Sequence, residues 1–418
     1  MTPALAPQDA LEIAATIGFG IARRALWSGE RCTWFDAIPT MPQQNPATST
    51  MAGADLYGGT SGIGLFLAQA AVRSGDALLR RTARASMRQS AARVDAHAQA
   101  PHGFYGGAAG VGAALVLAGC ALDDTQAVDA GRAILLGLPD DAPVPDVTDI
   151  IGGIAGTIAA LALAADALGR DVALLARAAE FAERLLARGT RDARGTLSWR
   201  TLPEVTANLT GFAHGAAGIA HALLLLDALA PEPALRAAAA AAFAYEATTF
   251  DAAQANWPDF RAFPGQAPGP PGYQVAWCHG AAGIVRSRLF AEACGGFQVA
   301  AEIDAGLGTT ARYVEQWFRA PNADFTVCHG LFGLVDTLID AVRSGRGTHA
   351  ALLAAVVGYT TERFHRGENP WPSGLITHEE VSGLMLGNAG IGHIYLRLAD
   401  PSLGSLLAPM PRAGQPVR

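Results

Sequence analysis

Two short stretches of the sequence place a cysteine directly beside a histidine and then a glycine: Cys278-His279-Gly280 and Cys328-His329-Gly330. Thiolate sulfur and imidazole nitrogen are the ligands that Zn²⁺ prefers, usually four in a tetrahedron. Two cysteines and one histidine supply three ligands and leave one position open, which is the pattern of a catalytic zinc. A free cysteine also commonly fills a hydrophobic core, so each of the two cysteines, taken singly, has that alternative.

The ligands of such a site must come from separate elements of the fold, because the sequence has no pair of cysteines at zinc-finger spacing. A repeated pattern shows what these elements are. It consists of a glycine, two or three small or polar residues, a second glycine and an apolar run, and it occurs seven times. The second glycines are Gly62, Gly110, Gly156, Gly218, Gly283, Gly333 and Gly390. Their intervals of 48, 46, 62, 65, 50 and 57 residues accommodate two helices each, so the sequence predicts stacked helix pairs.

The two helices of each pair differ in their expected burial. The run after each glycine pair is apolar on nearly all sides, which is typical of a buried inner helix. The stretches between the copies are amphipathic and rich in alanine and arginine, which is typical of outer helices with one solvent-exposed face. Examples of the outer kind are Ala77–Ala96, Asp171–Ala187 and Ala234–Tyr245.

These pairs predict an all-α fold, an α/α toroid of about seven inner and seven outer helices. We expect one domain over residues 1–418, with an N-terminal outer helix and lead-in over residues 1–50 and a frayed tail over residues 408–418. The segments Arg191–Asn208 and Ala253–Gly272 lack helical period and are expected as rim loops, because each precedes a copy that carries a histidine. The glycine turns should gather the chemistry at one end of the inner helices.

Composition excludes several classes of function. Half of the chain is hydrophobic, 16% is charged and the net charge is −7, with no basic patch, so a nucleic-acid partner is not expected. The five cysteines have no framework spacing, which indicates reduced thiols and a cytoplasmic protein. The N-terminus lacks the basic start of a secretory signal, and the apolar runs are too short to span a membrane.

The sequences of the copies resemble those of the lanthionine synthetase C-like family. The motifs WCHGAAG, VCHG, GFAHGAAGIA, DIIGGIAG and GLMLGNAGIG follow the family's order, and the resemblance extends from about Leu56 to Leu398. Several of these motifs are most similar to those of the cyclase part of the LanM-type lanthipeptide synthetases. With 418 residues, the chain is expected to be a cyclase without the dehydratase part that precedes it there.

The resemblance implies a zinc ion held by Cys278, Cys328 and His329. It implies a substrate too: a dehydrated precursor peptide, leader plus core, that carries dehydroalanine or dehydrobutyrine. A cysteine thiol of the peptide would add to the alkene and close a thioether ring. A separate dehydratase would be a possible partner.

The resemblance also implies roles for His214, Asp149 and His279. A histidine suits the proton transfer that completes the addition, because its pKa lies near working pH, and we expect His214 to be this acid with Asp149 orienting or charging a histidine nearby. Each assignment has a structural alternative. Asp149 precedes an apolar helix and could be its N-cap, and His214 could be a core histidine bonded to backbone.

One position departs from the family pattern. Stand-alone LanC cyclases commonly carry an arginine four residues before the first zinc cysteine, and this chain has Gln274 there. Arg288, in the inner helix after that cysteine, is a possible substitute for stabilising the enolate; alternatively, it is simply a buried or rim arginine.

Three other functions remain open from the sequence. A related enzyme would add glutathione or another thiol to dehydroamino acids, and a binding module would hold a peptide or partner with a structural zinc. A glycosidase on the same type of barrel needs two carboxylates facing one cleft, and Asp149 has no evident partner for that role.

Overall fold

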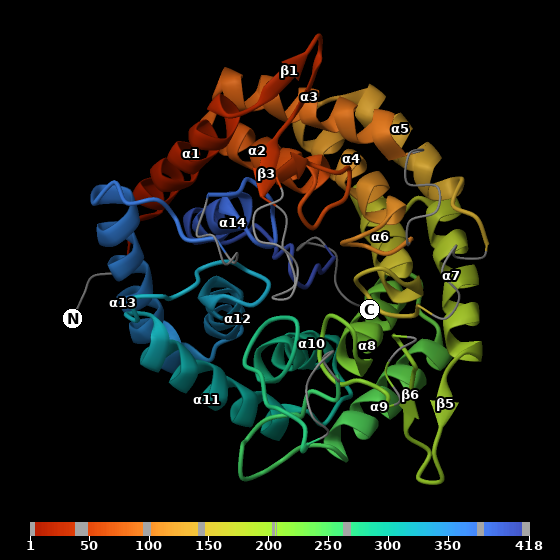
Figure 1. Ribbon diagram of the computed structural model, residues 1–418. Helices are drawn as coiled ribbons and strands as arrows, with labels where there is room; N and C mark the ends of the chain where they lie inside the picture. The colour runs from red at the N-terminus through yellow and green to blue at the C-terminus, as the bar shows by residue number, and fades with distance from the viewer. Residues whose placement is uncertain are drawn as a thin grey trace. The chain divides into compact units, whose positions relative to one another are not determined.

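The protein is mostly helical in the computed structural model, which describes residues 5–37, 49–94, 102–140, 147–202, 205, 207–261, 269–373 and 380–411. In this part of the chain, a buried helix follows each of the seven glycine turns, as predicted. These helices are α2 (Thr60–Ser74), α4 (Ala108–Leu122), α6 (Ile154–Ala167), α8 (Ala216–Leu229), α10 (Ala281–Cys294), α12 (Leu331–Arg343) and α14 (Asn388–Ala399) (Figure 1). All fourteen residues of α8 are buried, which fits its apolar sequence.

The helices that alternate with them are amphipathic and partly exposed. They are α1 (Pro7–Arg23), α3 (Ala77–Arg93), α5 (Thr125–Leu136), α7 (Val172–Ala187), α9 (Pro233–Ala247), α11 (Ala300–Trp317) and α13 (Ala350–Thr360). Asp76 caps α3 by accepting a hydrogen bond from the Leu79 amide, and Asp171 caps α7 in the same way. A short 3₁₀ turn (Gly347–His349) precedes α13, and a π turn (Thr361–Arg366) extends it.

Strands are confined to three short antiparallel pairs among the described residues. β1 (Leu26–Ser28) pairs with β2 (Arg31–Thr33), with Trp27 opposite Cys32. β3 (Phe35–Ala37) pairs with β4 (Ser49–Met51), and β5 (Thr190–Arg191) pairs with β6 (Leu197–Ser198). The last pair lies in a segment for which the sequence predicted no helix.

The chain forms two compact units. The first contains residues 1–97, 114–133 and 314–405, and the second contains residues 98–113, 134–313 and 406–418. The single domain expected from the sequence stays a prediction.

In six of the seven turns, a close contact with the turn's own backbone requires glycine at the last position. We call the seven residues that end at the second glycine, such as Trp277–Gly283, a glycine turn, and we number its positions one to seven. A Cβ added at Gly283 would lie 2.0 Å from the carbonyl oxygen of Trp277, and one at Gly110 would lie 1.6 Å from that of Phe104. Any side chain at position seven would therefore collide with the carbonyl at position one.

Neighbouring turns are hydrogen-bonded to each other through position two. In the first unit, the Cys328 amide donates to the Met385 carbonyl (3.0 Å), and the Met385 amide donates to the Tyr57 carbonyl (2.8 Å). In the second unit, the Ala213 amide donates to the Cys278 carbonyl (3.0 Å). The backbone thus holds adjacent turns of one unit in a fixed register.

The C-terminal tail is packed beyond the residue where fraying was expected. Ala408 is buried, and the carbonyl of Pro409 accepts a hydrogen bond from His221 Nε2 (2.8 Å). The carbonyl of Leu407 accepts another from the indole of Trp277 (2.7 Å). Residues 412–418 lie outside the described part of the chain.

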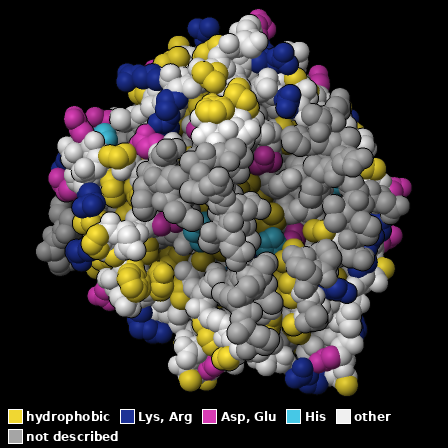
Figure 2. All heavy atoms as spheres, viewed as in Figure 1, with side chains coloured by type: hydrophobic (Ala, Val, Ile, Leu, Met, Phe, Trp, Pro, Cys, Tyr) yellow, Lys and Arg dark blue, Asp and Glu magenta, His cyan; other side chains and the backbone are white. Residues whose placement is uncertain are grey.

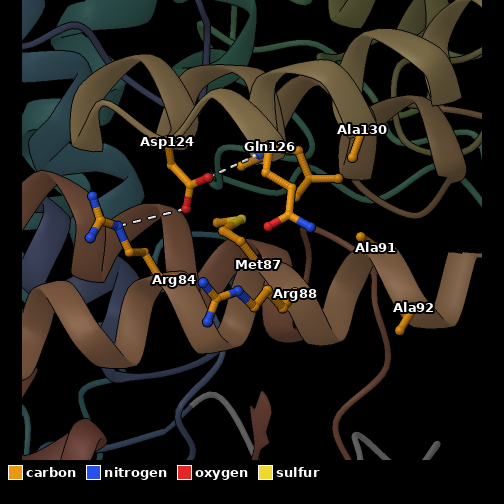
Figure 3. A pocket seen from close by; sticks show the side chains of 10 residues that line it. Arg84, Met87, Arg88, Ala91, Ala92, Asp124, Gln126 and Ala130 are labelled. Carbon is orange, nitrogen blue, oxygen red and sulfur yellow. Dashed lines mark hydrogen bonds and ion pairs between the residues drawn. The ribbon is translucent and has the colours of Figure 1, made fainter. Parts of the chain in front are cut away.

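A groove of about 270 Å³ lies between α3 and α5 in the first unit (Figure 3). Arg84 forms an ion pair with Asp124 across it (3.6 Å), and Asp124 caps α5 through the Ala127 amide. None of the predicted site residues lines this groove.

On the face shown in Figure 2, arginine side chains are scattered and form no continuous basic patch. No described helix is both long enough and apolar enough to cross a membrane.

Candidate functional site

His214 and Asp149 form a direct pair in the second unit. The Nδ1 atom of His214 lies 2.5 Å from Oδ2 of Asp149. The carboxyl side chain is 2% exposed, whereas the imidazole is 24% exposed. With a proton on Nδ1, the ring donates to the carboxylate, and its Nε2 atom on the opposite side of the ring remains for other partners. His214 is therefore bonded to a carboxylate and not to backbone.

Asp149 is held in place by its second carboxyl oxygen. Oδ1 accepts hydrogen bonds from the amides of Gly152 (2.8 Å) and Gly153 (3.1 Å). Gly153 is the N-cap residue of α6, so Asp149 stabilises the turn before this helix. One oxygen thus has the capping role that the sequence allowed, and the other orients His214.

His279 lies against His214. The two rings are 5.8 Å apart between centroids, with 29° between their planes. His279 is 1% exposed, and its Nε2 atom is buried without a hydrogen-bond partner among the described residues. Burial, the charge of Arg261 and a smaller effect of His214 lower the pKa of His279 to about 3, against the opposing effect of Asp259. The ring is consequently neutral at physiological pH.

An ion pair of Asp259 and Arg261 completes this cluster. Oδ1 of Asp259 lies 4.0 Å from Nδ1 of His279. The Arg261 guanidinium donates to both carboxyl oxygens, from Nε at 3.0 and 3.2 Å and from Nη2 at 2.8 Å. Burial alone would raise the pKa of Asp259, but hydrogen bonds from Arg261 and the nearby positive charges hold it below its usual value.

The segment that carries Asp259 is anchored in the core, although the sequence predicted a rim loop. Residues 256–259 are all buried, and the Trp257 indole donates to the Glu246 carbonyl (3.1 Å). The Thr210 hydroxyl donates to the Pro258 carbonyl (2.7 Å), and the Asp259 amide to the Gly272 carbonyl (2.8 Å). Residues 262–268 of the same predicted loop lie outside the described part.

The turn that carries Cys278 and His279 is tight. Gly280 has a φ of +82°, and a Cβ there would lie 1.8 Å from the Gln274 carbonyl oxygen, so this position requires glycine. The same carbonyl accepts a hydrogen bond from the Asn256 side chain (3.0 Å). Cys278 is half-buried in this turn, directly beside His279.

The other predicted ligands lie in the first unit. Cys328 is 6% exposed, and its sulfur accepts a hydrogen bond from the Tyr57 hydroxyl (3.1 Å). His329 has a side chain that is 44% exposed, with Nε2 3.8 Å from Oδ2 of Asp324. Tyr57 and Cys328 both occupy position two of their turns, and the backbone of Met385 in the seventh turn bonds to both of these residues.

The three predicted zinc ligands are thus distributed over both units. Within either unit, the described residues contain no group of three or more His, Cys, Asp or Glu side chains that could hold a metal ion. Zinc binding therefore stays a prediction. The donor set suits zinc chemically, because it offers two thiols and an imidazole, and the Tyr57 hydroxyl donates a hydrogen bond to the sulfur of Cys328.

Arg288 is a core residue and cannot replace the arginine missing at position 274. Its side chain is fully buried, with Nη1 2.8 Å from Glu246 and Nε 2.7 Å from Glu302. The guanidinium also stacks on Phe243, 4.1 Å from the ring centroid. Such a group has no access to a peptide substrate.

Tyr57, Asp259 and Arg261 were not among the site residues predicted from the sequence. A signal for Tyr57 was its place in the first copy, which corresponds to that of Cys328 in the sixth. A signal for the other two was charge, because Asp259 and Arg261 are the only charged residues between positions 253 and 272.

Comparisons with known proteins agree on the family and the fold. A family model described as "Lanthionine synthetase C-like protein" matches residues 50–408. A solved structure of a nisin cyclase is similar, with a TM-score of 0.60 and 15% identity over 84% of this chain and 89% of the other. A cellobiose 2-epimerase from Spirochaeta thermophila DSM 6192 has a TM-score of 0.51 and 15% identity, over 94% and 97% of the two chains. A search of curated proteins found no match.

At 15% identity, these structural likenesses show the fold alone. They confirm the predicted fold class, an all-α fold of the α/α toroid type.

Proposed function

Because the chain belongs to the lanthionine synthetase C-like family, we propose that it is a zinc-dependent lanthipeptide cyclase. It would add cysteine thiols of a dehydrated precursor peptide to dehydroalanine or dehydrobutyrine and so form thioether rings. The observation that carries this proposal is the pair of Asp149 and His214, with His279 stacked beside it in the turn of Cys278. This arrangement supports the proposal, because the histidine that would transfer the proton lies beside the turn that carries a predicted zinc ligand.

The reaction requires an ionised thiol and a proton donor. As the sulfur–carbon bond forms, the π electrons of the alkene move toward the neighbouring amide oxygen, and the α-carbon then takes up a proton. A free thiol with a pKa of about 8.5 is only about 3% ionised at pH 7, and a zinc ion held by Cys278, Cys328 and His329 would supply the thiolate. The protein must provide the rest.

His214 is the proposed proton donor. Its Nδ1 atom is bonded to Asp149, which fixes the orientation of the ring. The partly exposed ring then presents Nε2 to the α-carbon of the peptide. Since Asp149 is itself held by two backbone amides, the direction of this transfer is fixed by the fold of one turn.

His279 would act as a neutral polar group beside it. Its low pKa keeps the ring uncharged, so it does not compete with His214 as the charged acid.

The test is to give the purified protein a dehydrated peptide with one free cysteine and to follow the loss of the thiol by alkylation and mass. Ring closure leaves the peptide mass unchanged and removes one alkylation site. The expected result is closure that depends on zinc. Closure no faster than in buffer would contradict the proposal, and conversion only after glutathione is added, with a glutathione adduct as product, would identify a thiol-adding enzyme instead.

A further inference from the structure

The addition step places negative charge on an amide oxygen, and an enzyme must meet that charge with fixed donors or a cation. The choice of cation is narrow in this protein. None of its 418 residues is lysine, so all 30 residues of the combined lysine and arginine count are arginine. Arg288 is excluded by its burial between two glutamates. The cation must therefore be another arginine, or a histidine.

We propose that Arg261, held in place by Asp259, is a catalytic residue that donates hydrogen bonds to the amide oxygen as it becomes negative. This inference rests on the proposed function and adds a residue to it. The thiolate sulfur bonds to the β-carbon, and the π pair moves onto the oxygen, where the guanidinium stabilises it. The pair then returns as His214 delivers its proton to the α-carbon, and Arg261 is unchanged.

The geometry around Arg261 supports this role. Asp259 binds the Nε and Nη2 edge of the guanidinium in a bidentate manner, which fixes the plane of the group. The carboxylate is 5% exposed, whereas the arginine side chain is 20% exposed. The pair is thus oriented with its anion inside and its cation toward the side that solvent reaches.

Asp259, which holds the guanidinium, lies beside the two histidine rings: its Oδ1 is 4.0 Å from Nδ1 of His279, and the His279 ring stacks on that of His214. A negative charge that develops beside these rings would be stabilised by the guanidinium.

The segment of Arg261 is paired with the segment of Gln274, where stand-alone LanC cyclases commonly have arginine. The Asp259 amide bonds to the Gly272 carbonyl, and the Asn256 side chain bonds to the Gln274 carbonyl. Because this pairing is antiparallel, Gln274 lies beside Asn256, whereas Arg261 lies on the other side of the Asp259–Gly272 pair. A guanidinium at position 261 therefore starts from a different point of the paired segments than one at position 274 would.

The primary experiment compares Arg261→Gln with wild type in single-turnover ring closure. The expected result is a rate reduced by about 10²–10³, the loss typical for one oxyanion donor, with zinc content, melting temperature and peptide affinity unchanged. The rate should fall less in Arg261→Lys, because lysine keeps the positive charge and lacks only the planar guanidinium with its fixed N–H donors. The matched control is Arg194→Gln, which removes an exposed arginine that also pairs with an aspartate two residues away and should leave the rate unchanged.

The Arg261→Lys variant separates catalysis from a structural role. Because it keeps the charge, it should close rings at least tenfold faster than Arg261→Gln at an equal melting temperature. A loss in Arg261→Gln that accompanies a lower melting temperature and is not reduced in Arg261→Lys would overturn the inference. So would an Arg261→Gln variant that closes rings within threefold of wild type.

The same data distinguish the inference from the proposed function. If wild type does not close rings, the proposed function fails and this inference fails with it. If wild type is active and His214→Asn is impaired while Arg261→Gln is not, only the role of Arg261 is wrong.

Discussion

Two clusters of charged side chains in the second unit differ in what they leave accessible. In the turn cluster, Asp149 and Asp259 are buried, but their partners His214 and Arg261 keep 24% and 20% of their side-chain surface. In the core cluster, Glu246 and Arg288 are both fully buried. The carboxylates are alike in burial, so the cationic partner decides which cluster can meet a substrate.

The core cluster has a supporting role that its contacts reveal. Oε1 of Glu246 accepts hydrogen bonds from the amides of Gly211 (2.9 Å) and Ala217 (3.0 Å), which flank the turn that carries His214. Arg288 compensates the charge that this requires. The core cluster thus holds the backbone of a turn, and the turn cluster presents side chains from it. Substitutions in the first should lower stability, whereas substitutions in the second should lower rate.

The largest effect is expected from the ligands of the predicted zinc. Cys328→Ala should abolish both zinc binding and ring closure and leave the helical circular dichroism spectrum intact, because the hydrophobic core does not depend on the metal. Metal analysis and the ring-closure assay check this. Cys32→Ala is the matched control in the same unit and should retain the metal, since Cys32 is a buried thiol bonded to the Thr82 carbonyl, with a pKa raised by burial to about 12. Equal zinc in Cys328→Ala and wild type would remove Cys328 from the ligand set.

The next largest effect concerns the turn cluster. His214→Asn should retain zinc and slow ring closure by about 10²–10⁴, the usual contribution of one general acid. His393→Asn is the control, because His393 is a buried histidine bonded to Gln69 and has no assigned role. Ring closure by His214→Asn within threefold of wild type would show that this histidine does not move the proton.

Substitutions in the core cluster should lower the free energy of unfolding. Arg288→Met leaves the buried Glu246 without its charge partner and should cost about 3–5 kcal/mol in the free energy of unfolding, measured by urea denaturation. Adding Glu246→Gln should return part of that loss, because it removes the unpaired charge. A loss below about 1 kcal/mol in the single variant would mean that the pair does not hold the turn as described.

A smaller effect is expected at Tyr57. Tyr57→Phe removes the hydroxyl that donates to Cys328 and keeps the ring. If the sulfur is a zinc ligand, the affinity for zinc should fall about 10–100-fold, as is typical when a group that supports a ligand is lost. Competition with a chelator measures this change. Unchanged affinity would indicate that the hydrogen bond belongs only to the metal-free protein.

The sequence predicted the repeated helices well because their cause is local. In six of the seven copies, the carbonyl at position one excludes a side chain at position seven, so these copies need glycine at a fixed spacing, and the pattern marks where a buried helix begins. The closeness of His214 and Asp149 came from the family resemblance, and the structure gives the pair its distance and its anchors.

Asp259 and Arg261 could not be predicted in this way. The sequence of their segment has no helical hydrophobic periodicity. Its position depends on contacts with residues distant in sequence, such as the hydrogen bond from the Thr210 hydroxyl to the Pro258 carbonyl. Arg288 shows the opposite case. In the sequence it is close to the site, because it lies in the helix that follows Cys278. In the structure its side chain is buried in the core.

The glycine turn separates a position that cannot change from one that can. At position seven, a methyl group would overlap a carbonyl oxygen in the turn itself. At position three, where the fourth, fifth and sixth copies carry histidine, a Cβ added at Gly58 of the first copy meets no described atom within 4 Å. New functional groups can therefore be introduced at position three by single substitutions that leave the backbone in place. In evolutionary and engineering terms, the repeat is a scaffold with one interchangeable position per copy.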